Sequence, residues 1–349
     1  MEYVNADSFL STIPALPLVD VRSPAEYGKG HLTRAVNIPL FKDDERTIVG
    51  TLYKQKGRED AVAKGLEIAE PKMQGLVEAG KAIATDGKLA VHCWRGGMRS
   101  NRMAWLFEQN GMTCTVLEGG YKTYRNALLQ EFTDMTNLTV LAGQTGSGKT
   151  EILHALRDEG EQVLDLEGLA NHRGSAFGAI GMGPQPTSQQ FQNDLHAELR
   201  KLDRQKRIWI ERESMTIGKC YLPQPLWESM NRSRLISIDV PLEARIGRLV
   251  SYYGNAPKEK LAESIGKLQQ RLGNLNMTTA LRLLEEDRIA EVAELLLTYY
   301  DKGYRFNRRK YAKQKPILLK TTTDDASENA RLLINLADAE TGRLHLQSQ

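Results

Sequence analysis

Hydrophobic residues in the first 130 positions occur in short runs, separated by longer segments in which they recur with helical spacing. Runs of this length predict β-strands. The runs are Leu16–Val21, Ala35–Ile38, Leu89–Cys93 and Cys114–Leu117. Strands that alternate with helix-length segments are typical of a parallel α/β sheet, so we expect this part to form one α/β domain.

The rest of the chain repeats the pattern. Its strand-length runs are Leu138–Ala142, Gln162–Leu166, Arg207–Ile210, Arg234–Val240 and Pro316–Leu319. Among the helical patterns between them, the longest predicts one helix over Leu281–Tyr300. The polar stretch Glu131–Asn137 marks the expected boundary, which gives domains at 1–132 and 133–349, each long enough to bury its own core.

Composition narrows the class of protein. No run approaches the ~18 apolar residues that a membrane span requires, and the first residues lack a secretory pattern. The three cysteines, Cys93, Cys114 and Cys220, have neither disulfide-framework nor metal-ligand spacing, so we expect a cytoplasmic protein with no metal site. The net charge of +3 is uneven: residues 301–315 carry seven Lys/Arg against one Asp.

A cysteine follows the apolar run 89–91 and precedes a helical pattern over 101–110. Such a loop surrounds the sulfur with backbone N–H groups at a helix N-terminus, which stabilises a thiolate. Cys93 is therefore predicted to be a nucleophile, and Arg99 to close the loop over a tetrahedral anion. The other anion-binding loop residues are Trp94, Arg95, Gly96, Gly97, Met98 and Ser100. Cys114 and Cys220 are expected to be structural, in a strand and in a loop, and a resolving role for Cys114 stays open.

A phosphate-binding loop is predicted between the strand run 138–142 and a helical pattern at 151–157. Its residues are Gly143, Gln144, Thr145, Gly146, Ser147, Gly148, Lys149 and Thr150, which fit G-x-x-x-x-G-K-[ST] at every position. Lys149 would meet the outer phosphates, and Thr150 could ligate Mg²⁺. Asp165 and Glu211 compete as the accompanying acid, and Arg245 and Arg248 could reach phosphates from a lid.

Four segments around the cysteine loop resemble the rhodanese family, in which the cysteine carries a transferred chalcogen. They are residues 19–27 (VDVRSPAEY), 30–32 (GHL), 35–39 (AVNIP) and 117–121 (LEGGY). The span from Cys93 to Arg99 is one residue longer than in commoner single-domain rhodaneses and resembles the rhodanese-like phosphatases. The loop is therefore expected to admit a phosphate-sized anion.

The order of the two loops, together with residues 164–175 (LDLEGLANHRGS), resembles bacterial tRNA 2-selenouridine synthases over nearly the whole chain. This resemblance implies a rhodanese-like parallel-sheet domain followed by a P-loop NTPase-like α/β domain with a helical C-terminal part. It also implies an enzyme that replaces the sulfur of wobble 2-thiouridine (position 34) in tRNA with selenium from selenophosphate, via S-geranylation with geranyl diphosphate. A selenophosphate source would be a partner, Mg²⁺ is possible, and no tightly bound cofactor is expected. Residues expected to bind tRNA are Lys302, Arg305, Arg308, Arg309 and Lys310, interleaved with aromatic residues.

Other functions stay open at this point. One is an ATP-dependent kinase or ATPase with a regulatory rhodanese domain, which ATP turnover without tRNA would favour. Another is a binding module, against which the intact Cys93 and Arg99 count. A Cys-loop sulfurtransferase or phosphatase would leave the phosphate loop unexplained. The sequence also leaves open whether Cys93 carries selenium covalently, and residues 302–315 could instead form a solvated charged loop.

Overall fold

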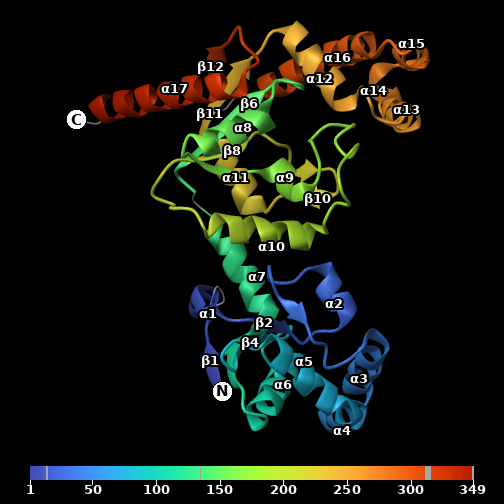
Figure 1. Cartoon of the computed structure of the whole chain (residues 1–349), viewed down its shortest axis with the longest axis vertical. Helices are drawn as coiled ribbons and strands as arrows, with labels where there is room; N and C mark the ends of the chain where they lie inside the picture. The colour runs from blue at the N-terminus through green and yellow to red at the C-terminus, as the bar shows by residue number, and fades with distance from the viewer. Residues whose placement is uncertain (13–14, 134, 311–315, 348–349) are drawn as a thin grey trace. The chain divides into compact units, whose positions relative to one another are not determined.

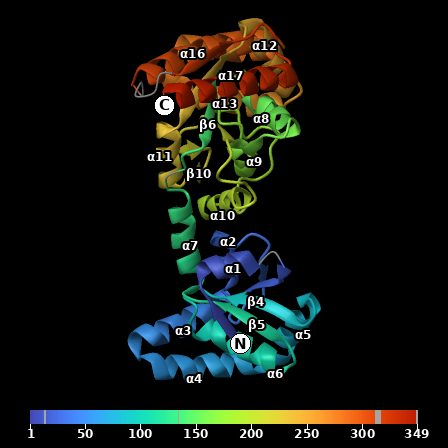
Figure 2. The ribbon, with the colours of Figure 1, turned by 90° about the vertical axis from the view of Figure 1, so that its left-hand side faces the viewer.

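The computed structural model describes residues 1–12, 15–133, 135–310 and 316–347, with side chains for 1–11, 15–133, 135–304 and 316–340. The chain divides into two compact units, one formed by residues 1–131 with 187–197 and the other by 132–186 with 198–349. Each unit contains a five-stranded sheet with helices packed around it (Figures 1 and 2). In the part of the chain that the structure describes, no helix is long and apolar enough to cross a membrane.

The sheet of the first unit is parallel throughout. Its strand order is β1 (Glu2–Val4), β5 (Thr113–Leu117), β4 (Lys88–His92), β2 (Leu18–Asp20) and β3 (Val36–Asn37). The four predicted strands are present, and β1 adds an edge strand that its short, mostly exposed sequence did not indicate. Val19, Leu89, Val91 and Val116 are fully buried, which is why these runs lack polar residues on either face.

Helices cover this sheet and extend beyond it. They are α1 (Ala6–Thr12), α2 (Pro24–Lys29), α3 (Asp43–Gln55), α4 (Arg58–Ala69), α5 (Met73–Ile83), α6 (Met98–Gln109) and α7 (Gly120–Glu131). A capping box starts α2: the Ser23 hydroxyl accepts a hydrogen bond from the backbone N–H of Glu26, whose carboxylate accepts from the N–H of Ser23. The helices α3 and α4 pack against each other and lie between β3 and β4 in sequence.

One helix of the first unit comes from the second half of the chain. Residues 187–197, most of α10 (Ser188–Leu199), belong to the first unit, although the predicted boundary placed them in the second domain. Side-chain hydrogen bonds explain this. The Asn193 amide donates to His31 O at 2.7 Å and to Tyr121 Oη at 2.8 Å, and Gln190 accepts from the N–H of His31 at 2.9 Å.

The second unit repeats the parallel architecture. Its strand order is β12 (Ile317–Lys320), β11 (Arg234–Asp239), β6 (Leu138–Gly143), β8 (Ile208–Glu211) and β7 (Gln162–Leu164). A small antiparallel pair, β9 (Thr216–Ile217) with β10 (Cys220–Tyr221), lies outside it. The prediction that Cys220 lies in a loop is therefore wrong: it is a buried strand residue paired with Ile217.

The helices of this unit surround the sheet and form the helical C-terminal part. They are α8 (Lys149–Asp158), α9 (Leu166–Ala170), α11 (Gln224–Arg232), α12 (Leu242–Tyr253), α13 (Lys258–Gly266), α14 (Gln269–Leu272), α15 (Asn274–Glu285), α16 (Ile289–Lys310) and α17 (Ala326–Gln347). The prediction of one helix over Leu281–Tyr300 is wrong, because Asp287 adopts a left-handed conformation (φ 59°). Arg288 N donates to Leu283 O across this residue, as in a Schellman C-cap. The apolar spacing continues across the break because α15 and α16 pack into one hydrophobic cluster.

Candidate functional site

The cysteine loop connects the end of β4 to the start of α6. Cys93 follows the last residue of β4, and its side chain is 3% exposed. Its Sγ lies 3.2 Å from the Ser100 hydroxyl, which donates to Gly97 O at 3.1 Å. Because Gly97 is the N-cap position of α6, the sulfur is held beside the first turn of that helix.

Two glycines fix the shape of this loop. Gly96 and Gly120 have φ values of +59° and +61°, which favour glycine. A Cβ atom on Gly120 would clash with Cys93 O and Gly96 N, so the turn before α7 packs directly on the cysteine loop. Tyr121 N donates to Cys93 O at 2.8 Å and secures this contact. The LEGGY segment is therefore the support on which the cysteine loop rests.

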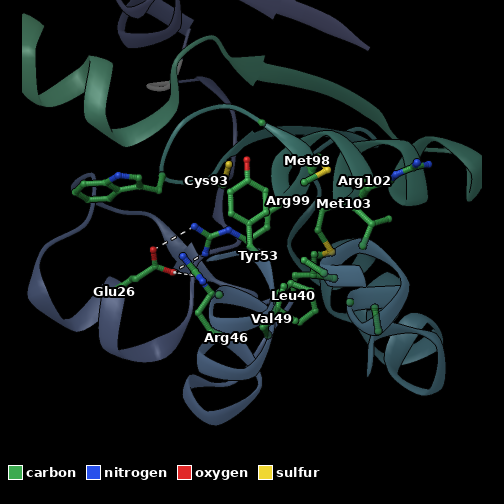
Figure 3. Close-up of a pocket in the computed structure, with 18 of the residues that line it drawn as sticks. Glu26, Leu40, Arg46, Val49, Tyr53, Cys93, Met98, Arg99, Arg102 and Met103 are labelled. Atoms are coloured by element: carbon green, nitrogen blue, oxygen red, sulfur yellow. Dashed lines mark hydrogen bonds and ion pairs between the residues drawn. The ribbon is translucent and has the colours of Figure 1, made fainter. Parts of the chain in front are cut away.

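Arg99 makes a bidentate ion pair with Glu26 of α2. Its Nη1 and Nη2 lie 2.5 Å and 3.1 Å from the two Glu26 oxygens (Figure 3). Burial alone would raise the pKa of Glu26, but the Arg99 guanidinium lowers it below its ordinary value. Arg46 Nε lies 3.8 Å from the same carboxylate. Sequence reasoning assigned no role to Glu26. Its place in the capping box was the available signal, but a pairing with Arg99 is not visible in sequence.

A buried ion pair accounts for the V-D-V-R part of the sequence. Arg22 Nη2 lies 2.6 Å from Asp20 Oδ2, and both side chains are fully buried. The Arg22 guanidinium also lies 3.9 Å from the centre of the Tyr121 ring. His92 is buried beside them, and this burial lowers its pKa. These polar residues thus form a structural network at the ends of β2 and β4.

A groove of about 1130 Å³ opens beside Cys93, within the first unit. Cys93, Arg99 and Glu26 line it together with apolar side chains (Figure 3). The apolar lining comes from the segment after β3 and from α3, α4, α5 and α6, and includes Leu40, Phe41, Val49, Tyr53, Val62, Leu66, Met73, Met98, Met103, Trp105 and Leu106.

The phosphate loop lies between β6 and α8. Gly146 and Gly148 have φ values of +79° and +77°, so the motif glycines supply the conformation that this loop needs. Lys149 Nζ lies 3.4 Å from Gly143 O at the start of the loop. The side chain of Ser147 is buried under it.

Arg245 and Arg248 of α12 bind carbonyl groups of the phosphate loop. Arg245 Nε donates to Thr145 O and Arg248 Nη1 donates to Gly146 O, both at 2.9 Å. Arg245 is also paired with Asp301 at 2.7 Å, and its side chain is almost fully buried. Neither guanidinium is arranged as a lid; each holds the loop from its carbonyl side.

The two carboxylates predicted as alternatives for the acid of the phosphate loop, Asp165 and Glu211, make different contacts in the structure. Asp165 caps α9, where its carboxylate accepts from Gly168 N at 2.7 Å, and His154 Nε2 lies 3.0 Å away. Glu211 is fully buried and accepts from Glu167 N at 2.7 Å. Burial, then the nearby Asp165 and Glu167 charges, raises the pKa of Glu211 well above its usual value. Both residues thus organise α9.

A different carboxylate contacts the loop. Thr150 Oγ1 donates to Glu167 Oε2 at 2.7 Å. Glu213 interacts with Glu167, and burial followed by the Glu167 charge raises the pKa of Glu213 to about 7. Sequence reasoning missed both residues, although Glu167 stands only two positions after Asp165. Among the described residues, no group of three or more His, Cys, Asp or Glu side chains is arranged to hold a metal ion.

Of the remaining candidates, the side chains of Lys302 and Cys114 are among the described residues and those of four basic residues are not. Lys302 is an exposed residue of α16. The side chains of four predicted tRNA-binding residues lie outside the described residues: Arg305, Arg308, Arg309 and Lys310. Cys114 is buried in β5, and burial raises the pKa of its thiol to about 12, as expected of a packing residue.

Comparison with known proteins places this geometry in a family. Residues 136–333 match the model of the tRNA 2-selenouridine synthase AAA domain, and residues 5–127 match the rhodanese-like domain. A tRNA 2-selenouridine synthase of Shewanella frigidimarina is 38% identical over 74% of this chain and 70% of its own length. One from Sulfurovum sp. is 35% identical over 83% of this chain and 88% of its own length.

One solved structure of related sequence matches part of this chain. The N-terminal domain of a putative ATP/GTP binding protein from Clostridium difficile 630 is 35% identical to this chain; the match covers 37% of this chain and 99% of that one, with a TM-score of 0.34. The two matched domains define a chain with a rhodanese-like unit and a P-loop unit. It belongs to the tRNA 2-selenouridine synthase family.

Proposed function

We propose that the protein is a tRNA 2-selenouridine synthase that replaces the sulfur of 2-thiouridine at wobble position 34 with selenium from selenophosphate, through an S-geranyl intermediate. The observation that carries the proposal is that one chain contains two functional loops. The cysteine loop lines a groove, and the phosphate loop has every residue of its motif. The first suits a soft chalcogen donor that is also a tetrahedral anion. The second suits a substrate whose diphosphate must be held and released.

In the first step, the thiocarbonyl sulfur attacks the first carbon of geranyl diphosphate. The new S–C bond forms as the C–O bond breaks, and the diphosphate leaves with the electron pair. Lys149 and the loop N–H groups stabilise the charge that grows on the leaving group. Mg²⁺ also fits here, because the Thr150 hydroxyl lies beside the Glu167 carboxylate and Mg²⁺ prefers hard oxygen ligands. Thr150 would hold the ion, which would supply further positive charge to the diphosphate when bound.

In the second step, selenium attacks C2 of the base. A C–Se bond forms, the C–S bond breaks, and geranyl thiol leaves after taking a proton. Water accepts the phosphoryl group of the donor, so that phosphate is released. Cys93 and the backbone N–H groups of its loop assist selenium delivery, and Arg99, oriented by Glu26, supplies positive charge for the selenophosphate anion.

The test is mass spectrometry of wobble nucleosides in tRNA from cells grown with selenite. Cells with the gene should contain 2-selenouridine, and cells without it should retain 2-thiouridine. Complementation with Cys93→Ala should restore the S-geranyl nucleoside but not the selenium product. Unchanged 2-selenouridine in cells that lack the gene would overturn the proposal.

A further inference from the structure

Large apolar side chains are exposed around the groove beside Cys93. Tyr53, Leu66, Met98 and Trp105 line it, although 56%, 49%, 45% and 49% of each side chain is exposed. Together they form a hydrophobic rim that comes from three helices: α3, α4 and α6. Exposed apolar surface gathered at a concave site is typical of a binding site for an apolar ligand.

The size of the groove distinguishes it from a second apolar cavity, which lies next to the phosphate loop. That second cavity touches Thr145 of the phosphate loop and is lined by Phe177, Tyr253 and other apolar residues, but its volume is about 50 Å³. Sites for small organic ligands span roughly 300–1000 Å³. The groove beside Cys93, at about 1130 Å³, has room for a prenyl chain and part of a nucleoside.

Charged side chains at the same groove fit a nucleic-acid ligand that carries such a chain. Lys54, Arg95 and Arg102 are exposed and line the groove together with the apolar residues. Their positive charge is complementary to backbone phosphates. The groove therefore combines an apolar floor, a cationic edge and the Cys93 sulfur.

We propose that this groove receives the geranyl chain of S-geranyl-2-thiouridine, with the C2–S bond of the base placed beside Cys93. The inference rests on the proposed function and assigns its second step a ligand site. In that intermediate, the chain is attached through sulfur to C2, the atom that selenium attacks. The first carbon of the geranyl chain is two bonds from C2. A site that holds C2 at the cysteine loop must therefore also accommodate the start of the chain. Burial of each methylene strengthens binding by about fourfold.

The experiment compares two anticodon stem-loops, one with S-geranyl-2-thiouridine and one with S-methyl-2-thiouridine. They present the same base and the same kind of leaving group but differ in the apolar chain. We expect the full-length protein to bind the S-geranyl RNA at least tenfold more tightly. The ratio of the two selenation efficiencies (kcat/KM) should favour the geranyl substrate similarly.

Two neighbouring residues of α3 provide a matched pair of variants. Val49 lines the groove, whereas Ile48 is 46% exposed and does not. Val49→Trp should fill the groove and reduce the geranyl-to-methyl ratio at least fivefold, while Ile48→Trp should leave it unchanged. If Val49→Trp does not fold, Leu66→Gln tests the same surface at a half-exposed position, with Ile48→Gln as its match. A ratio near one in the wild type, or an equal change in both members of a pair, would overturn the inference.

Failure of the proposed function gives a different result. A protein that makes no 2-selenouridine from either RNA would overturn the proposed reaction, whatever the binding ratio. A protein that makes 2-selenouridine from both RNAs with equal efficiency, and binds both equally, would retain the reaction and lose the groove assignment. The binding measurement needs no chemical step, so it tests the groove independently.

Discussion

Replacing Lys149 by alanine should separate the two chemical steps. The substitution removes an ammonium group from the first residue of α8, where it lies beside the phosphate loop. In geranyl transfer, negative charge on the diphosphate grows towards the transition state. A cation held there stabilises the transition state more than the ground state, which is the condition for an effect on rate.

The size of the effect follows from the surroundings of the loop. Two unit charges about 4 Å apart interact by about 4 kcal/mol at an effective dielectric constant of about 20. Loss of one preorganised donor commonly costs about 2.7–4 kcal/mol, or on the order of 10²–10³ in rate. Arg245 and Arg248 cannot replace the lost charge in place, because both donate to carbonyl groups of the loop. We therefore expect geranyl transfer to fall by the full 10²–10³.

The assay supplies the purified variant with two substrates in turn. With 2-thiouridine tRNA and geranyl diphosphate, and without ATP, the first step should show the defect. With S-geranyl tRNA and selenophosphate, activity should be close to wild type, because this reaction has no diphosphate to expel. Cys93→Ala is the opposite control, active in the first assay and inactive in the second. If Lys149→Ala is equally inactive on both substrates, the phosphate loop serves selenium transfer or ATP, and the assignment of geranyl transfer to the phosphate loop is wrong.

Three further predictions test other parts of the chain. Cys93→Ala should abolish 2-selenouridine formation while circular dichroism stays native, because only one buried sulfur is lost; wild-type turnover would exclude a catalytic role. Neutralising the five basic residues expected to bind tRNA should weaken tRNA binding. The slope of log binding constant against log salt concentration should become shallower by roughly 0.7–0.9 per lost phosphate contact, as measured by titrations at several salt concentrations. An unchanged slope would place the tRNA elsewhere. The substituted residues are Lys302, Arg305, Arg308, Arg309 and Lys310. Because burial and Glu167 raise the pKa of Glu213 from 4.5 to about 7, the folded protein keeps a proton that the unfolded chain releases, and the free energy of unfolding should fall as pH rises through that range. Glu213→Gln should flatten this decrease in urea unfolding at about pH 5 and about pH 8, and an equally steep decrease would contradict the assignment.

Local patterns made the fold class and the positions of both loops predictable. Buried parallel strands are uninterrupted apolar runs, so the runs at 89–93 and 138–142 identify strands without knowledge of their neighbours. The phosphate loop follows from residues adjacent in sequence, since its glycines provide the positive φ values that its backbone adopts.

What could not be predicted depends on contacts between distant residues. Arg99 and Glu26 are 73 positions apart, and nothing local to either residue specifies the pairing. The Thr150–Glu167 contact likewise depends on how β7 brings α9 to the loop. Arg245 was assigned towards phosphates because its carbonyl partner, 100 positions away, is a backbone atom without a sequence signal. The break at Asp287 was missed because helical apolar spacing continues on both sides of it.

The placement of residues 187–197 in the first unit affects how the chain can fold during synthesis. N-terminal domains generally fold as units while the rest of the chain is still being made. Here the ribosome must translate β6, the phosphate loop, α8 and α9 before it reaches the helix that completes the first unit. Until then Tyr121 Oη and the backbone of His31 lack the Asn193 amide that binds them in the finished protein. The nascent rhodanese-like part thus lacks residues 187–197 while the first part of the P-loop unit is already being synthesised. A fragment that ends near residue 132 would lack this helix permanently.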